Sequence, residues 1–140
     1  MEKRPYIMVV DDDQRMRGML NRNLRLEGYG TAMATDGSSA LAVLKKRRPD
    51  LVILDIMMPE LDGFQVLNLI RQRSSIPVIT LTARCEAPPL RKARVVGAGD
   101  YVQIPFTIPE LLARVKAKLR RARTGVRQAT KASALEHLRH

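Results

Sequence analysis

Short apolar runs alternate with longer amphipathic stretches along most of this chain. The apolar runs have the length and the β-branched content of buried strands, and they lie at residues 6–10, 31–34, 51–54, 77–81 and 101–104. The stretches between and after them carry apolar residues at helical spacing, which predicts helices at residues 14–27, 38–47, 64–71, 90–96 and 108–119. Gly28 and Pro49 are expected to end the first two helices.

Strand and helix therefore alternate five times. This order predicts an α/β fold in which a five-stranded parallel sheet carries five helices on its two faces. In such doubly wound folds the functional site lies at the carboxyl ends of the strands.

Charge divides the chain into two parts. The net charge of +11 suggests a nucleic-acid partner, but residues 1–110 hold 16 basic and 13 acidic side chains. Residues 111–140 hold 9 basic side chains and one acid, Glu136, so a nearly balanced domain leads into a basic segment. We expect no membrane span and no signal peptide. A single cysteine, Cys85, excludes an internal disulfide framework and favours a cytoplasmic setting.

Acidic residues follow two of the predicted strands. Asp11, Asp12 and Asp13 come after the first strand and Asp55 ends the third, so these side chains open onto one edge of the sheet. Neighbouring carboxylates repel one another, and a divalent cation with oxygen ligands, above all Mg²⁺, relieves that repulsion. Aspartates after strands are also common helix caps, and Asp13 or Asp36 fits that role. Spacing alone does not decide between capping and metal binding.

Five segments carry a family resemblance: VVDDD (9–13), DLVILDIMMPELDGFQVL (50–67), PVITLTAR (77–84), GAGDYVQIPF (97–106) and PELLARVKAKLRR (109–121). On these segments, from about Tyr6 to Arg121, the chain is identified as a member of the receiver domains of bacterial two-component response regulators. The resemblance implies a flavodoxin-like (βα)5 fold with strand order 2-1-3-4-5. It implies a signalling protein rather than an enzyme, with at most self-catalysed phosphotransfer and autodephosphorylation.

The resemblance also implies roles for single residues. Asp55 corresponds to the acceptor of a phosphoryl group from a partner histidine kinase. Asp12 corresponds to a direct ligand of Mg²⁺ and Asp11 to an indirect one, and the backbone carbonyl of Met57 is similar to a further ligand. Thr82 and Tyr101 match the switch residues. The loop that shapes the pocket matches Met57, Pro59, Asp62 and Gly63, where Gly63 also reads as a permissive turn residue that begins a helix.

Ile104 departs from the family, because a lysine is expected at that position. Isoleucine supplies neither charge nor a hydrogen bond, so the carboxylates would repel one another more and depend more on Mg²⁺. Two interpretations follow. Either Asp55 still accepts phosphate and signals differently, or the receiver is an atypical dimerisation or docking module that works without phosphorylation. The Pro88-Pro89 pair is a second departure, before the predicted helix at residues 90–96.

The segment PELLARVKAKLRRAR resembles the last receiver helix of OmpR/PhoB-type transcription factors. That likeness implies a homodimer through the fourth helix, fifth strand and fifth helix, with Asp100, Arg114, Lys118 and Arg121 as candidate contacts. We expect a receiver at residues 1–123 and a basic linker at 124–140. The linker leads to an output domain absent from this chain, through which alone the protein would meet DNA. A stand-alone signalling adaptor and a receiver with a catalytic output are the competing interpretations.

Overall fold

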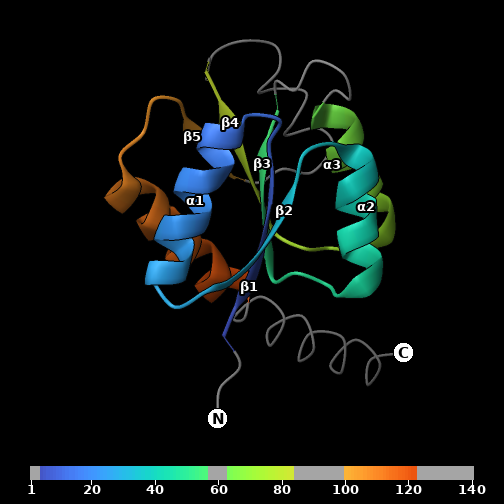
Figure 1. Cartoon of the computed structure of the whole chain (residues 1–140). Helices are drawn as coiled ribbons and strands as arrows, with labels where there is room; N and C mark the ends of the chain where they lie inside the picture. Colours follow the sequence, from blue (N-terminus) through green and yellow to red (C-terminus); the bar gives the residue numbers. More distant parts are fainter. Residues whose placement is uncertain (1–3, 57–62, 84–99, 123–140) are drawn as a thin grey trace, which may run out of the picture.

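Five parallel strands form one sheet in the order β2-β1-β3-β4-β5 (Figure 1). The computed structural model describes residues 4–56, 63–83 and 100–122. The strands are β1 (Tyr6–Val10), β2 (Gly30–Ala34), β3 (Leu51–Asp55), β4 (Val78–Thr82) and β5 (Asp100–Gln103). The predicted parallel sheet and its strand order are therefore confirmed, with strand ends shifted by a residue or so.

Helices connect the strands and cover both faces of the sheet (Figure 1). They are α1 (Gln14–Leu26), α2 (Gly37–Lys46) and α3 (Gly63–Arg73), and residues 108–122 form what we call the last helix. The helix predicted at residues 90–96 lies outside the described residues, as do Cys85, the Pro88-Pro89 pair and the linker predicted at 124–140.

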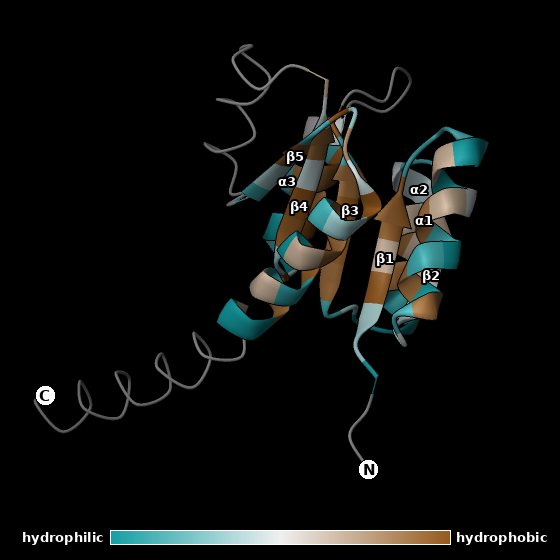
Figure 2. Cartoon of the chain, turned by 90° about the vertical axis from the view of Figure 1, so that its left-hand side faces the viewer, coloured by the Kyte–Doolittle hydropathy of each residue, from teal (hydrophilic) through white to brown (hydrophobic). Residues whose placement is uncertain are grey.

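Alternation along the strands divides the core into two clusters, one on each face of the sheet. One face packs Met8, Val52 and Val78 against α2 and α3. The other packs Val9, Ile53 and further residues against α1 and the last helix. Figure 2 shows the consequence, with apolar strands in the middle and hydrophilic outer helix faces. Central strands buried on both sides explain the continuous apolar runs of the sequence.

The helix ends follow capping chemistry that the sequence contains. Asp13 caps α1, because its side chain accepts a hydrogen bond from the backbone N–H of Arg15 at 3.0 Å. Asp36 and Ser39 form a reciprocal capping box at the start of α2. Gly28 ends α1 in a left-handed conformation with φ of 93°, as predicted. The two aspartates for which capping was weighed are thus both caps.

The helices run antiparallel to the strands they follow, so helix starts gather at the carboxyl end of the sheet and helix ends at the amino end (Figure 1). The last turns at the amino end are basic, with Arg25 in α1, Lys45 and Lys46 in α2, and Arg71 and Arg73 in α3. The two ends of the sheet therefore carry side chains of opposite charge.

Candidate functional site

Three carboxylates meet at the carboxyl end of the sheet. Asp11, Asp12 and Asp55 each place a carboxylate oxygen within 4.8 Å of the others. They meet because β1 pairs directly with β3, with Val10 opposite Leu54, so the residues at both strand ends emerge side by side. Asp11 is buried, Asp55 half-buried and Asp12 exposed. The cluster is thus open to solvent on one side.

Asp11 is held by hydrogen bonds from three directions. Its backbone N–H donates to the carbonyl of Ala34 in β2 at 3.0 Å. Its own carbonyl accepts from Nη1 of Arg17 at 2.9 Å, and its Oδ1 accepts from the backbone N–H of Asp13 at 2.9 Å. The N-terminal part of α1 therefore fixes the most buried carboxylate before any ligand arrives.

The Asp11 carboxyl is strongly perturbed. Burial, which leaves the residue 2% exposed, is the main cause that raises its pKa from 3.8 to about 7. The hydrogen bond from Asp13 lowers the pKa, whereas the charges of Asp55, Asp12 and Asp13 raise it further. At neutral pH the Asp11 carboxyl is thus divided between its protonated and ionised forms, and a bound cation would favour the ionised form.

This donor set fits a hard divalent cation. Its ligand atoms are all carboxylate oxygens, they lie close enough to share one ion, and the exposed side leaves room for ligands such as water. A cation there would compensate the like charges that raise the pKa of Asp11. The predicted ligands Asp11, Asp12 and Asp55 are therefore brought together, while Met57, Pro59 and Asp62 lie outside the described residues.

Thr82 and Tyr101 lie on the two strands beyond the cluster. Thr82 ends β4, next to β3, and is 1% exposed. Tyr101 is half-buried in β5. Both predicted switch residues thus occupy the two strands that follow β3 in the sheet, on the side away from β1.

Ile104 follows the end of β5. Its backbone N–H donates to the carbonyl of Thr82 at 2.7 Å, which joins it to the end of β4. Its side chain packs against the core cluster beneath α1 and the last helix, whereas Gln103 beside it is exposed. Position 104 therefore contributes apolar contact where the family's lysine would contribute charge, and Gln103 points elsewhere.

Gly63 supports the site for a reason that the sequence did not reveal. A Cβ at this position would lie 2.5 Å from the carbonyl oxygen of Asp55 and 2.5 Å from Cα of Ile56. Gly63 begins α3, as predicted. Its φ is not positive, so backbone freedom is not the reason for a glycine at this position. Gly63 is required because α3 begins directly against the end of β3. A glycine shortly after an acidic strand end is the sequence signal for it.

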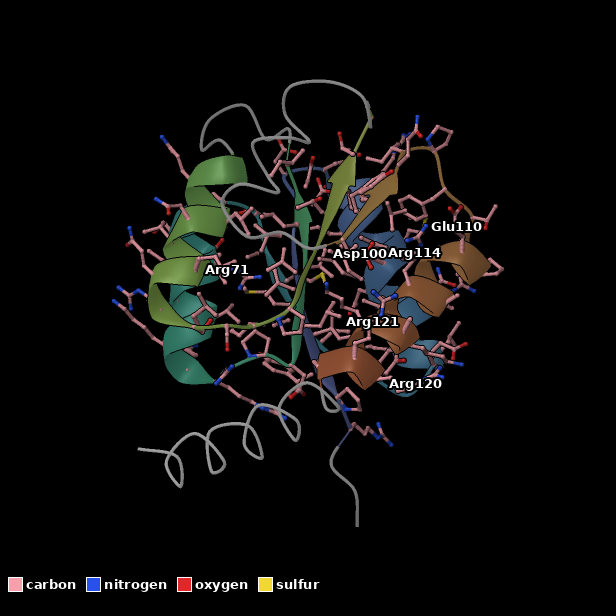
Figure 3. All side chains as sticks on the ribbon, turned by 180° about the vertical axis from the view of Figure 1, so that it is seen from behind. Arg71, Asp100, Glu110, Arg114, Arg120 and Arg121 are labelled. Carbon is pink, nitrogen blue, oxygen red and sulfur yellow. The ribbon has the colours of Figure 1, made fainter. Side chains whose placement is uncertain are left out.

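The four candidate dimer contacts lie along β5 and the last helix. Nη1 of Arg114 lies 3.3 Å from Oδ1 of Asp100, in the same chain, and Figure 3 shows the two residues side by side. Asp100 is 9% exposed and its Oδ1 also accepts from the backbone N–H of Tyr101. Burial lowers the pKa of Lys118, and Arg121 and Arg71 lower it further, whereas Asp100 opposes the shift. The ion pair between Arg114 and Asp100 connects the last helix to β5 within one molecule.

Fold and site together define a class: a doubly wound parallel α/β domain with an acidic cluster at the ends of its first and third strands. The response regulator receiver domain family matches this chain over residues 7–116. The chain belongs to this family and is the receiver domain of a two-component response regulator, a signalling protein.

Named relatives and solved structures agree with this assignment. The DNA-binding response regulator MtrA of Mycolicibacterium smegmatis is 45% identical over 118 residues, 84% of this chain and 52% of MtrA. Response regulator MprA of a Mycobacterium species is 44% identical over 116 residues, 82% of this chain and 50% of MprA. The receiver domain of NtrX from Brucella abortus superposes with a TM-score of 0.75 at 33% identity, over 81% of this chain and 98% of that chain.

The chain spans about half the length of the curated relatives it matches. Both relatives are of the OmpR/PhoB type, as the sequence of the last helix suggested. Within the described residues, none of the helices is long and apolar enough to cross a membrane.

Proposed function

We propose that this receiver is the phosphoacceptor part of a transcriptional response regulator, and that Asp55 accepts a phosphoryl group from a histidine kinase in the presence of Mg²⁺. The meeting of Asp11, Asp12 and Asp55 within 4.8 Å is the observation that carries this proposal. The likeness to MtrA, which is named a DNA-binding response regulator, supports transcription as the output.

In this proposal a carboxylate oxygen of Asp55 attacks the phosphorus of a phosphohistidine. An O–P bond forms, the N–P bond breaks, and the imidazole leaves with the bonding electron pair. Asp12, Asp55 and the backbone carbonyl of Met57 would hold Mg²⁺, with Asp11 acting indirectly. The ion would supply positive charge that compensates the carboxylates and the incoming phosphoryl oxygens. Thr82, at the end of the adjacent strand, would donate a hydrogen bond to a phosphoryl oxygen, and Tyr101 would act as the second switch residue.

The test is phosphorylation by a small donor. With phosphoramidate and Mg²⁺, the intact protein should gain about 80 Da, one phosphoryl group. Asp55→Asn should gain nothing. Asp36→Asn is the matched control, because it removes a carboxylate at the same end of the sheet while asparagine keeps the cap. No gain in the wild type with Mg²⁺, or an equal gain in Asp55→Asn, would contradict the proposal.

Ile104 favours a second candidate, an atypical receiver that docks partners without phosphorylation. The two candidates are separated by Ile104→Lys, which places a cation at the end of β5. Under the phosphoacceptor proposal the wild type and Ile104→Lys both gain the phosphoryl mass, and only the rate differs. A gain in Ile104→Lys alone would instead identify the wild type as the atypical module.

Phosphorylation is proposed to control a homodimer through the face that carries β5 and the last helix. The candidate contacts are Asp100, Arg114, Lys118 and Arg121, because all four lie on β5 or the last helix. In a dimer, Arg114 would exchange its partner within the chain for Asp100 of the second copy. Light scattering with and without beryllofluoride, a phosphoryl mimic, should show a monomer that becomes a dimer. A monomer at every concentration in both states would contradict the dimer.

A further inference from the structure

Basic side chains gather at the amino end of the sheet, where three helices end, and we call this set of cations the basic pole. It consists of residues 45–48 at the end of α2, Arg71 and Arg73 at the end of α3, and Lys118, Arg120 and Arg121 on the last helix. Most of these side chains are exposed. The basic pole lies opposite the carboxylate cluster, because the helices end where the strands begin (Figure 1).

Two of the three parts of the basic pole, on α3 and on the last helix, lie close together. Arg121 and Arg71 both lower the pKa of Lys118, so cations of α3 and of the last helix lie within reach of one another. Nη1 of Arg71 donates to the carbonyl of Ile76, which holds its guanidinium at the amino end of β4. Figure 3 shows Arg71 on α3 and Arg120 and Arg121 on the last helix.

The α2 part of the basic pole is ordered by contacts at the start of β1. The guanidinium of Arg47 lies 4.2 Å from the ring centroid of Tyr6. Asp50 lies at the same end, but its Oδ2 accepts a hydrogen bond from the backbone N–H of Tyr6 at 2.7 Å. Glu27 pairs at 3.5 Å with Lys116, which is not part of the basic pole. Within the described residues, Asp50 is thus one negative charge beside the nine cations of the pole, which stays strongly positive.

We propose that the basic pole binds the phosphate backbone of double-stranded DNA without reading its sequence. Phosphate contacts by clustered cations provide sequence-independent affinity, and arginine, which dominates here, matches phosphate oxygens with its planar fork. The sequence after residue 122 contains further cations, at Arg123, Arg127, Lys131 and Arg139, which lie outside the described residues. The choice of DNA rests on the proposed transcriptional role, whereas the phosphate chemistry does not.

The surface suits DNA better than an anionic membrane. Stable membrane binding needs apolar side chains that insert beside the charges. Among the described residues, the exposed large hydrophobic side chain is Leu26, which lies on α1 outside the basic pole. A surface of cations with no apolar anchor of its own matches a phosphate backbone in water.

The test measures the affinity of the full chain for a fluorescein-labelled DNA duplex of arbitrary sequence at several NaCl concentrations. The pole variant carries Lys45→Gln, Lys46→Gln and Arg73→Gln, all at exposed positions. We expect its affinity to fall on the order of tenfold at low salt, and its log–log salt slope to shrink by up to about 3. The matched control carries Arg15→Gln, Arg22→Gln and Lys116→Gln, and should bind within about twofold of the wild type.

Three results would overturn the proposal. One is an equal loss in the pole variant and the matched control, which indicates attraction by net charge alone. Another is full binding by the pole variant while Arg123→Gln, Arg127→Gln and Lys131→Gln together abolish it. The third is binding to phosphatidylserine vesicles with none to the duplex.

The proposal is separable from phosphorylation. Asp55→Asn should lose phosphate incorporation and keep its affinity for DNA. If instead the wild type incorporates no phosphate but binds the duplex through the basic pole, the phosphoacceptor role fails and the DNA-binding role stands. Urea unfolding of each variant shows that a loss of binding does not reflect a loss of folding.

Discussion

The two ends of the sheet carry opposite charges in very different settings. At the carboxyl end, Asp11, Asp12 and Asp55 are crowded together and partly buried, so burial and, after it, the like charges raise the pKa of Asp11. At the amino end, the cations of the basic pole are mostly exposed and spread over three helices. Crowded, buried charge needs a specific counterion, whereas spread, solvated charge suits an extended polyanion.

Helix direction matches this distribution of charge. Helix starts carry partial positive charge and lie at the acidic end, where they attract carboxylates. Helix ends carry partial negative charge and lie at the basic end, where they attract cations. Residues 1–110 look nearly balanced as a sequence, with 16 basic and 13 acidic side chains. The fold separates these charges by end, so the folded domain is basic on one side even without the residues after 122.

The largest effect is expected where the acidic end depends on close packing. Gly63→Ala places a Cβ 2.5 Å from the backbone of Asp55 and Ile56, so β3 and α3 must move apart. We expect the free energy of unfolding to fall by about 3 kcal/mol, as measured by urea denaturation.

Gly18→Ala is the matched control for this change. Gly18 lies in α1, and a Cβ there meets nothing within 4 Å. Alanine favours the helix, so stability should rise by about 0.5–1 kcal/mol. A small loss of stability in Gly63→Ala, of the size usual for surface substitutions, would show that the acidic end tolerates a shift of α3.

A second test uses the pKa of Asp11. Because this pKa is raised from 3.8 to about 7 in the folded state, the folded protein binds the proton more tightly than the unfolded chain. Without metal, stability should therefore fall as pH rises from about 4 to about 7, and then level off. Asp11→Asn should flatten this decline and be more stable than the wild type at pH 8, by about 2 kcal/mol.

At pH 8, millimolar Mg²⁺ should make the wild type more stable than Asp11→Asn. The ion stabilises the folded wild type by binding it, whereas Asp11→Asn offers the ion one carboxylate fewer. Urea denaturation across pH, with and without Mg²⁺, measures both effects. A wild-type stability that does not change between pH 4 and 7 would contradict the raised pKa.

The smallest expected effect on stability distinguishes an aspartate that caps a helix from the aspartates proposed to bind Mg²⁺ at the carboxyl end of the sheet. Asp36→Ala removes the capping box of α2 and should lower the free energy of unfolding measurably, while Asp36→Asn, which keeps a capping oxygen, should cost little. Neither change should alter Mg²⁺ affinity, because Asp36 is not part of the carboxylate cluster. A Mg²⁺ affinity that falls with Asp36→Asn would place the cation elsewhere at this end.

Much of the fold could be predicted from the sequence, because buried parallel strands produce continuous apolar runs and the helices between them show a clear period. The acidic site was only partly predictable. Spacing did not distinguish Asp13 and Asp36, which cap helices, from Asp11, Asp12 and Asp55, which meet. That distinction depends on the pairing of β1 with β3 and on the direction of each side chain.

Two features could not be predicted, since both arise from contacts between distant segments. The need for glycine at position 63 comes from the approach of α3 to the end of β3. The basic pole comes from the parallel arrangement of helices whose charges are separate in the sequence. From the change in charge near residue 111, the sequence analysis assigned the excess positive charge to the last helix and the linker. That assignment missed the basic residues of α2 and α3.

The contact at Gly63 also bears on how variation among relatives should be interpreted. A Cβ at this position would meet the backbone of Asp55 and Ile56, so we expect glycine in every receiver whose third helix begins as close to its third strand. Asp12 is exposed and caps none of the described helices, so the fold makes no such demand on it. Under the proposed cation role, a relative with glycine at position 63 and no acid at position 12 would keep the fold and lack that ligand.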